Sequence, residues 1–289
     1  MPWIPRGMRN GIVTTRYPRR PDGYGPEFRG SVAVARDVAD DVDLARAAEA
    51  CPTGAITLLN GQVELDRGRC ILCGRCTQLC PRVFRFQSDF ETSVIERHAL
   101  VVRSDYEDGE VLDEARSELG RRVKSLQRSV HIRHVDAGSD GSEEWEIAAL
   151  LNPVYDVQRL GVFFTASPKH ADLLLVTGAG SAGMLGPLRD TYEVMPDPKV
   201  VIAAGADAIS GGLIGEGYAT RGGIGGTVPV DVYVPGSPPS PFGILHGILV
   251  AVGLLPPAGG GRSDRGAAGA GRSSHGPDIW EVRREGVVP

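Results

Sequence analysis

From Ser129 onward, short apolar runs alternate with helix-compatible segments. Four of the runs have the length and β-branched content of buried parallel strands, and they span 130–135, 172–177, 200–204 and 230–234. Polar, helix-compatible segments lie between them, notably Glu144–Leu151 and Met184–Glu193. This alternation predicts a doubly wound α/β domain with a four-stranded parallel sheet and right-handed crossovers. In such a sheet, the functional residues lie at the carboxyl ends of the strands.

The rest of the chain divides by composition. Residues 1–36 carry seven arginines beside only two acidic residues, which predicts an extended arm that either lies on a partner or is solvated. Residues 37–100 form a small domain, and the charged sequence of residues 101–128 predicts a helical linker. The α/β domain covers 129–255. Residues 256–289 are rich in Gly, Ala, Arg and Ser, which predicts a disordered tail.

All five cysteines lie in the small domain. Cys70, Cys73, Cys76 and Cys80 follow the C-x₂-C-x₂-C-x₃-C-P spacing of bacterial ferredoxins, in which the fourth cysteine ligates a second cluster. The two short intervals let the first three thiolates reach three irons of one cubane. Cys51, which precedes a proline, completes that set. The sequence therefore predicts one [4Fe–4S] cluster on Cys51, Cys70, Cys73 and Cys76.

A second cluster would need three more cysteines before Cys51. The positions at the required spacing are Asp41, Leu44 and Ala47, so Cys80 is predicted to be an orphan thiol. A zinc site would favour two separated C-x₂-C pairs or added histidines. A disulfide framework is disfavoured because no signal peptide precedes the motif.

Composition narrows the function classes. The net charge of −5 gives no reason to expect nucleic acid as a partner. The longest apolar stretch, 244–255, is shorter than the roughly twenty residues of a membrane-spanning helix, so we expect a soluble or peripheral protein. His131 and His134 alternate with apolar residues on a predicted strand, which predicts exposed strand positions and no metal ligation.

Three segments of the α/β domain resemble the B-type subunit of NADH–quinone oxidoreductase (complex I). They resemble the small subunit of formate hydrogenlyase-type membrane-bound [NiFe] hydrogenases more closely. These segments are Gly161–Gly178, Met195–Gly205 and Val228–Gly236. In the first half, 11–18, 28–30 and 68–76 resemble the I-type, ferredoxin-like subunit of the same complexes. The resemblance implies a fusion of two adjacent electron-transfer subunits. The resemblance also implies the fold class, an α+β ferredoxin-like domain followed by an α/β flavodoxin-like domain.

One departure from the family is severe. The B-type subunit holds a terminal [4Fe–4S] cluster on four cysteines at the strand ends, and the resemblance places Asp140, Glu143, Asp207 and Ser237 at those positions. Hard oxygen donors do not suit a sulfide-bridged iron cubane. We therefore expect the terminal cluster to be lacking, with the carboxylates either solvated or holding a divalent cation.

The resemblance implies an iron–sulfur electron-transfer and docking subunit of a membrane-bound hydrogenase-like or complex I-like oxidoreductase, not catalytic alone. Its implied partners are a large subunit and membrane ion-translocating subunits, and its implied location is peripheral, on the cytoplasmic side of the cell membrane. One alternative is a purely structural assembly subunit. Another is a nucleotide-binding oxidoreductase, because Gly178–Gly183 fits G-x-G-x-x-G and Asp207 stands where a ribose-binding acid would. Gly186 and Pro187 weaken that alternative, since both disfavour the helix that should follow.

Overall fold

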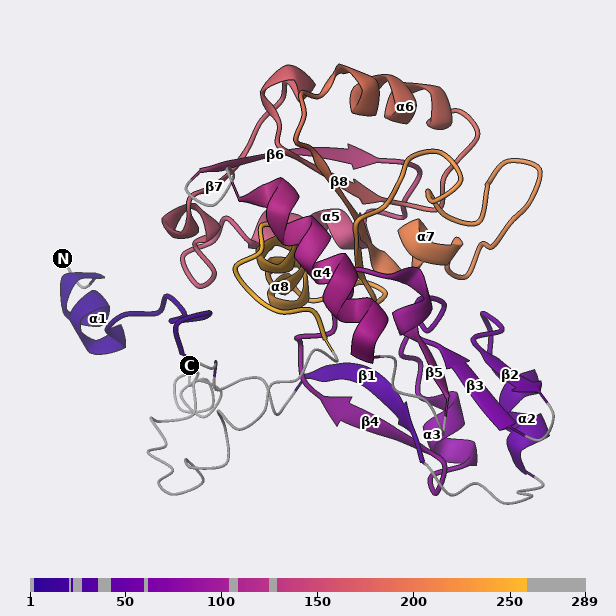
Figure 1. The fold of residues 1–289 in the computed structure, drawn as a ribbon. Coiled ribbons are helices and arrows are strands. Elements are labelled where there is room, and N and C mark those ends of the chain that lie inside the picture. Colours follow the sequence, from indigo (N-terminus) through magenta and orange to yellow (C-terminus); the bar gives the residue numbers. More distant parts are fainter. Residues whose placement is uncertain are drawn as a thin grey trace, which may run out of the picture.

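The structure is a computed structural model. It describes residues 3–20, 22, 28–35, 43–59, 62–103, 109–124 and 129–258. Figure 1 shows a larger part built on a parallel sheet and a smaller part made of short antiparallel strands.

The larger part contains a five-stranded parallel sheet. Its strands are β6 (Val130–Asp136), β7 (Val162–Phe164), β8 (Leu173–Thr177), β9 (Val200–Ala204) and β10 (Val232–Val234). They lie in the order β10-β9-β8-β6-β7, which is the flavodoxin-like order 2-1-3-4-5 in chain sequence. The four predicted strands are confirmed, whereas the predicted strand number was wrong. β7 was missed because it is a three-residue edge strand with too few apolar positions to show a pattern.

Helices cover both faces of this sheet. On one face, α8 (Pro241–Ala251), α4 (Gly109–Val123) and α5 (Ser142–Ala149) pack through a single apolar core. On the other face lie α6 (Leu185–Val194) and α7 (Gly205–Ser210). All residues of α8 are buried, which explains why its sequence is apolar on every side. Among the described helices, none combines the length and apolarity that crossing a bilayer requires.

The smaller part contains two antiparallel sheets. β1 (Arg29–Val34) pairs with β4 (Phe84–Ser88), and β3 (Gln62–Asp66) pairs with both β2 (Ile56–Leu59) and β5 (Val101–Arg103). Two short helices, α2 (Asp43–Glu49) and α3 (Arg75–Leu79), pack beside them. Its apolar core includes Phe84, Leu65 and Cys80. Three 3₁₀ helices complete the described elements: η2 (Arg97–Leu100), η3 (Val157–Leu160) and η4 (Pro168–His170).

Residues 1–36 differ in two places from the predicted extended arm. A short helix, α1 (Trp3–Asn10), has no buried residue, and β1 belongs to a sheet of the smaller part. The predicted tail lies outside the described residues beyond 258, as does Asp41.

The two parts are joined by main-chain bonds and by a cluster of aromatic rings. Val94 and Tyr233 exchange two backbone hydrogen bonds, of 3.0 and 2.8 Å. Phe90 from the smaller part stacks on Phe242 of α8 with 4.7 Å between ring centroids. Further rings make edge contacts with these two, namely Tyr17, Phe28 and Tyr155. This junction fixes the cysteine motif relative to the parallel sheet.

Candidate iron–sulfur site

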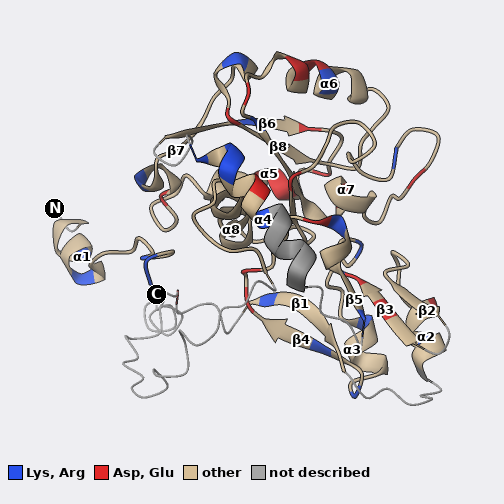
Figure 2. Ribbon diagram, in the orientation of Figure 1, with Lys and Arg blue, Asp and Glu red and all other residues tan. Residues whose placement is uncertain are grey.

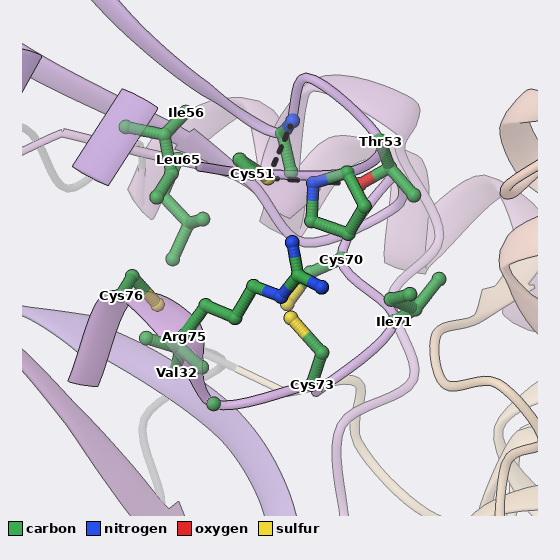
Figure 3. Close-up of a pocket in the computed structure, with 13 residues that line it drawn as sticks. Val32, Cys51, Thr53, Ile56, Leu65, Cys70, Ile71, Cys73, Arg75 and Cys76 are labelled. Atoms are coloured by element: carbon green, nitrogen blue, oxygen red, sulfur yellow. Dashed lines mark hydrogen bonds between the residues drawn. The ribbon is translucent and has the colours of Figure 1, made fainter. Parts of the chain in front are cut away.

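Four of the five cysteines line one cavity of the smaller part (Figure 3). Cys51 follows α2, Cys70 follows β3, Cys73 lies in the next loop, and Cys76 lies in the first turn of α3. The rest of the wall is mostly apolar, with Val32, Ile56 and Leu65 among its residues, and it also includes Thr53 and Arg75. Cys80 does not line this cavity. It is 2% exposed and packs in the apolar core.

The loop backbone turns amide groups toward these sulfurs. Leu72 and Gly74 adopt left-handed conformations, with φ of 55° and 77°, and this winds the motif tightly between Cys70 and α3. The main-chain amides of Leu72 and Thr77 lie by the thiols of Cys70 and Cys76 and act to lower their pKa values. The amide of Ala55 donates to Cys51 Sγ at 3.2 Å. Hydrogen bonds to sulfur are one of the means by which a protein sets the potential of an iron–sulfur cluster.

The donor set and its surroundings fit a [4Fe–4S] cluster. The pKa of both Cys70 and Cys76 is raised to about 11, mainly by burial and also by the neighbouring thiolates, while nearby main-chain amides act in the opposite direction. Four thiolates in this apolar cavity therefore need positive charge between them, which iron supplies. When bound, the cluster supplies one-electron chemistry at this place.

Three of the positions implied to have lost cluster cysteines lie close together at the carboxyl ends of the strands. Asp140 follows β6, Glu143 lies in the first turn of α5 and Asp207 in the first turn of α7. We call these three the carboxylate site. Ser237, which follows β10, is exposed.

Neither the carboxylate site nor the cysteines are arranged around a single ion. In the described ranges, no three His, Cys, Asp or Glu side chains converge in a way that would hold one metal ion. The expectation of a divalent cation at the carboxylate site therefore has no geometric support. The four cysteines line one shared cavity, and a four-iron cubane is held by four cysteine thiolates.

Glu143 is the most unusual member of the carboxylate site. The residue is fully buried, at 0% exposure, and its Oε1 has no hydrogen-bond partner among the described residues. Burial raises the pKa of Glu143 to about 7, and the charges of Asp207 and Asp140 act in the same direction. Burial also raises the pKa of Asp207. A carboxyl group in this environment is about half protonated at neutral pH.

A polar network lies beside this site and was not predicted from the sequence. The Thr177 hydroxyl donates to Glu144 Oε1, the Ser139 hydroxyl donates to Glu144 Oε2 at 2.7 Å, and His134 Nε2 lies 3.0 Å from Thr177 Oγ1. The His134 side chain is only 23% exposed, so its predicted exposure was wrong, whereas His131 is 44% exposed. Their position in the sequence could have revealed these residues, because they lie at or next to the carboxyl end of a predicted strand.

The glycine-rich loop 178–183 packs against protein and offers few groups to a phosphate. The amides of Ala179, Ser181 and Ala182 donate to main-chain carbonyls of neighbouring loops at 2.8 to 3.2 Å. Helix α6 begins only at Leu185, so its N-terminus does not point out of this loop. Both observations weigh against the dinucleotide-binding interpretation.

Comparison with known proteins finds two families in the chain. Residues 141–251 match the family described as NADH ubiquinone oxidoreductase, 20 Kd subunit. Residues 63–124 match the 4Fe-4S single cluster domain, which includes Cys70, Cys73 and Cys76 and begins after Cys51.

Named relatives align with about half of the chain or less. Formate hydrogenlyase subunit 7 of Escherichia coli is 43% identical over 133 residues, which is 46% of this chain and 52% of that protein. The probable membrane-bound hydrogenase subunit mbhJ of Pyrococcus furiosus is 42% identical over 144 residues, 48% of this chain and 86% of that protein. The B-type subunit of the NADH-quinone oxidoreductase of Geotalea daltonii is 46% identical over 95 residues, 33% of this chain and 55% of that protein.

These matches confirm the resemblance inferred from the sequence motifs. The chain belongs to the family of the 20 kDa subunit of NADH ubiquinone oxidoreductase and carries a 4Fe-4S single cluster domain ahead of that region.

Proposed function

We propose that the chain is an electron-transfer and docking subunit of a membrane-bound hydrogenase-like or complex I-like oxidoreductase. It binds one [4Fe–4S] cluster on Cys51, Cys70, Cys73 and Cys76. The observation that carries this proposal is the shared, mostly apolar cavity, into which two separate segments of chain bring four thiols, with the amide of Ala55 donating to Cys51 Sγ.

The cluster domain is held against the edge of the sheet that carries the carboxylate site. The Ser210 hydroxyl, at the end of α7, donates to the carbonyl of Gly68 at 3.0 Å, two residues before Cys70. A Cβ on Gly68 would lie 2.8 Å from the Ile209 side chain, so the contact is close and needs glycine. An electron on the cluster is therefore delivered next to α7, without a second cluster in this chain.

The α/β domain serves as the docking module. Asp140, Glu143, Asp207 and Ser237 are oxygen donors and do not hold an iron–sulfur cubane. Exposed apolar side chains lie on the segment after α7, including Leu213 at 64% and Ile214 at 62% exposure, and Trp145 on α5 is 78% exposed. These side chains suit a protein partner. The partners in this proposal are a large subunit and membrane ion-translocating subunits, with the chain peripheral on the cytoplasmic side of the membrane.

Iron and acid-labile sulfide should be measured on the full chain purified without oxygen. We expect about four irons per chain and an electron-paramagnetic signal on reduction. Serine at Cys51, Cys70, Cys73 or Cys76 should lower the iron content, whereas Cys80→Ser, in the apolar core, should retain it.

Two results would contradict this proposal. About eight irons would mean that the oxygen positions hold a second cluster. Absence of iron, with normal assembly into a complex, would favour a purely structural subunit.

A further inference from the structure

Glu143 is a buried acid with no role in the proposed electron transfer. It lies in the first turn of α5, with its Oε1 against the Cα of Gly205 at the start of α7: a Cβ built on that glycine would lie 2.5 Å from this oxygen. No described group donates to Oε1, and neither oxygen is paired with a cation in the described part of the chain. A fully buried and uncompensated carboxylate is costly, so the neutral acid is favoured at this position.

The other oxygen of Glu143 is connected to the surface by one hydroxyl group. Ser142 Oγ lies 3.1 Å from Glu143 Oε2 and 2.6 Å from Asp140 Oδ1. Asp140 is exposed, and its hydrogen bonds with Ser142 lower the pKa of its carboxyl group. The three residues therefore form a continuous hydrogen-bonded path from solvent to the buried acid.

The charged groups around Glu143 are predominantly acidic. Asp140 faces it from the β6–α5 loop and Asp207 from α7, and Figure 2 shows further acidic positions along α5. Glu144 is engaged by Thr177 and Ser139, and His134 of β6 lies 3.6 Å from Glu144. On α8, which packs against α5, the buried His246 contacts the amide of Ser93 and the carbonyl of Pro256.

We propose that Glu143 is a proton-loading site, which receives its proton from solvent through Asp140 and Ser142. A proton that reaches Asp140 Oδ1 passes to Ser142 Oγ, while the hydroxyl proton of Ser142 moves to Glu143 Oε2. The hydroxyl group is restored, and the net change is one proton moved from water to Glu143. The site lies beside Asp207 on the edge that the proposed docking uses, so the proton is held next to the partner.

The acidity of Glu143 suits this role, because its raised pKa of about 7 lets it gain and lose a proton near neutral pH. The site does not depend on the iron–sulfur cluster. It can therefore be tested on the full chain whatever the iron content proves to be.

Infrared difference spectra between the wild type and Glu143→Gln, recorded across pH, isolate the carbonyl stretch of this one acid. We expect a protonated carboxyl band that disappears with a midpoint near pH 7. Glu193→Gln, which changes an exposed acid on α6, should show no such component. Absence of the band at about pH 6 would overturn the proposal.

Ser142→Ala tests the path and keeps the buried acid, so the proposal remains falsifiable even if Glu143→Gln folds poorly. The band should persist with a higher midpoint, because the Ser142 hydrogen bond lowers the pKa of Glu143. After a pH jump, the band should grow at least about tenfold more slowly than in the wild type. Asp140→Asn should also slow loading. Loading at the wild-type rate in Ser142→Ala would show that the proton enters by another route and would overturn the relay.

Discussion

Replacement of Glu143 by glutamine should stabilise the folded chain at alkaline pH and leave it nearly unchanged in mild acid. Burial raises the pKa of this carboxyl group from 4.5 to about 7. Between these two values the folded chain binds more protons than the unfolded chain, so the contribution of Glu143 to stability falls as pH rises. Above about pH 7 the whole penalty remains, because the carboxylate is then charged and buried.

The size of the effect follows from the shift. Raising the pKa from 4.5 to about 7 corresponds to roughly 3.4 kcal/mol in the free energy of unfolding. Solvent close to the loop ends screens part of this penalty, so we expect about 2 kcal/mol. Glutamine carries no charge at any pH, so it does not incur this penalty. Its buried amide adds a cost in the free energy of unfolding that does not vary with pH.

The assay is denaturant unfolding of the wild type and Glu143→Gln at about pH 5 and about pH 8, under conditions that keep the cluster in the same state. The quantity to compare is the change between the two pH values in the stability difference, since a constant amide cost cancels there. We expect this change to be about 1–2 kcal/mol in favour of glutamine at the higher pH, because part of the penalty is already present at about pH 5, above the unfolded-state pKa of 4.5. Parallel stability curves for the two proteins would refute the reasoning, because they would show that Glu143 titrates alike in the folded and unfolded chains.

Three other substitutions test the packing. Gly205→Ala should destabilise the chain by about 3 kcal/mol, since φ is 95° there and the new methyl group would meet Glu143 Oε1. Adding Glu143→Ala should recover about half of that loss in a double-mutant cycle, and additive effects would contradict the predicted clash. Phe242→Leu should cost about 1–3 kcal/mol in thermal unfolding, because its ring is the centre of the aromatic cluster, whereas Phe163→Leu on the edge strand should cost much less. His246→Leu should cost about 1–3 kcal/mol in denaturant unfolding, because it leaves a buried main-chain N–H without its acceptor, and an unchanged midpoint would contradict this.

The cysteine motif shows how far local sequence reaches. Its spacing alone indicated which four thiols belong together, because three of them lie within a few residues and fix the wrapping of the chain. The four long strands were also predictable. β8 and β9 are buried on both faces and leave continuous apolar runs, whereas β6 and the run that contains β10 show apolar residues alternating with polar ones. These features depend on neighbours along the chain.

The burial of Glu143 depends on residues far away in the sequence. Its immediate sequence neighbours, Ser142 and Glu144, are polar, and Gly205, from the end of another strand, packs directly against its buried carboxyl group. The same holds for His134, which was predicted to be exposed and has a side chain only 23% exposed, and for β7, which is defined by its pairing with β6. Spacing and periodicity therefore predicted the four cysteines that line one cavity and four of the five strands of the sheet. The tertiary structure decided which polar groups lost their water, because desolvation depends on everything packed around a side chain.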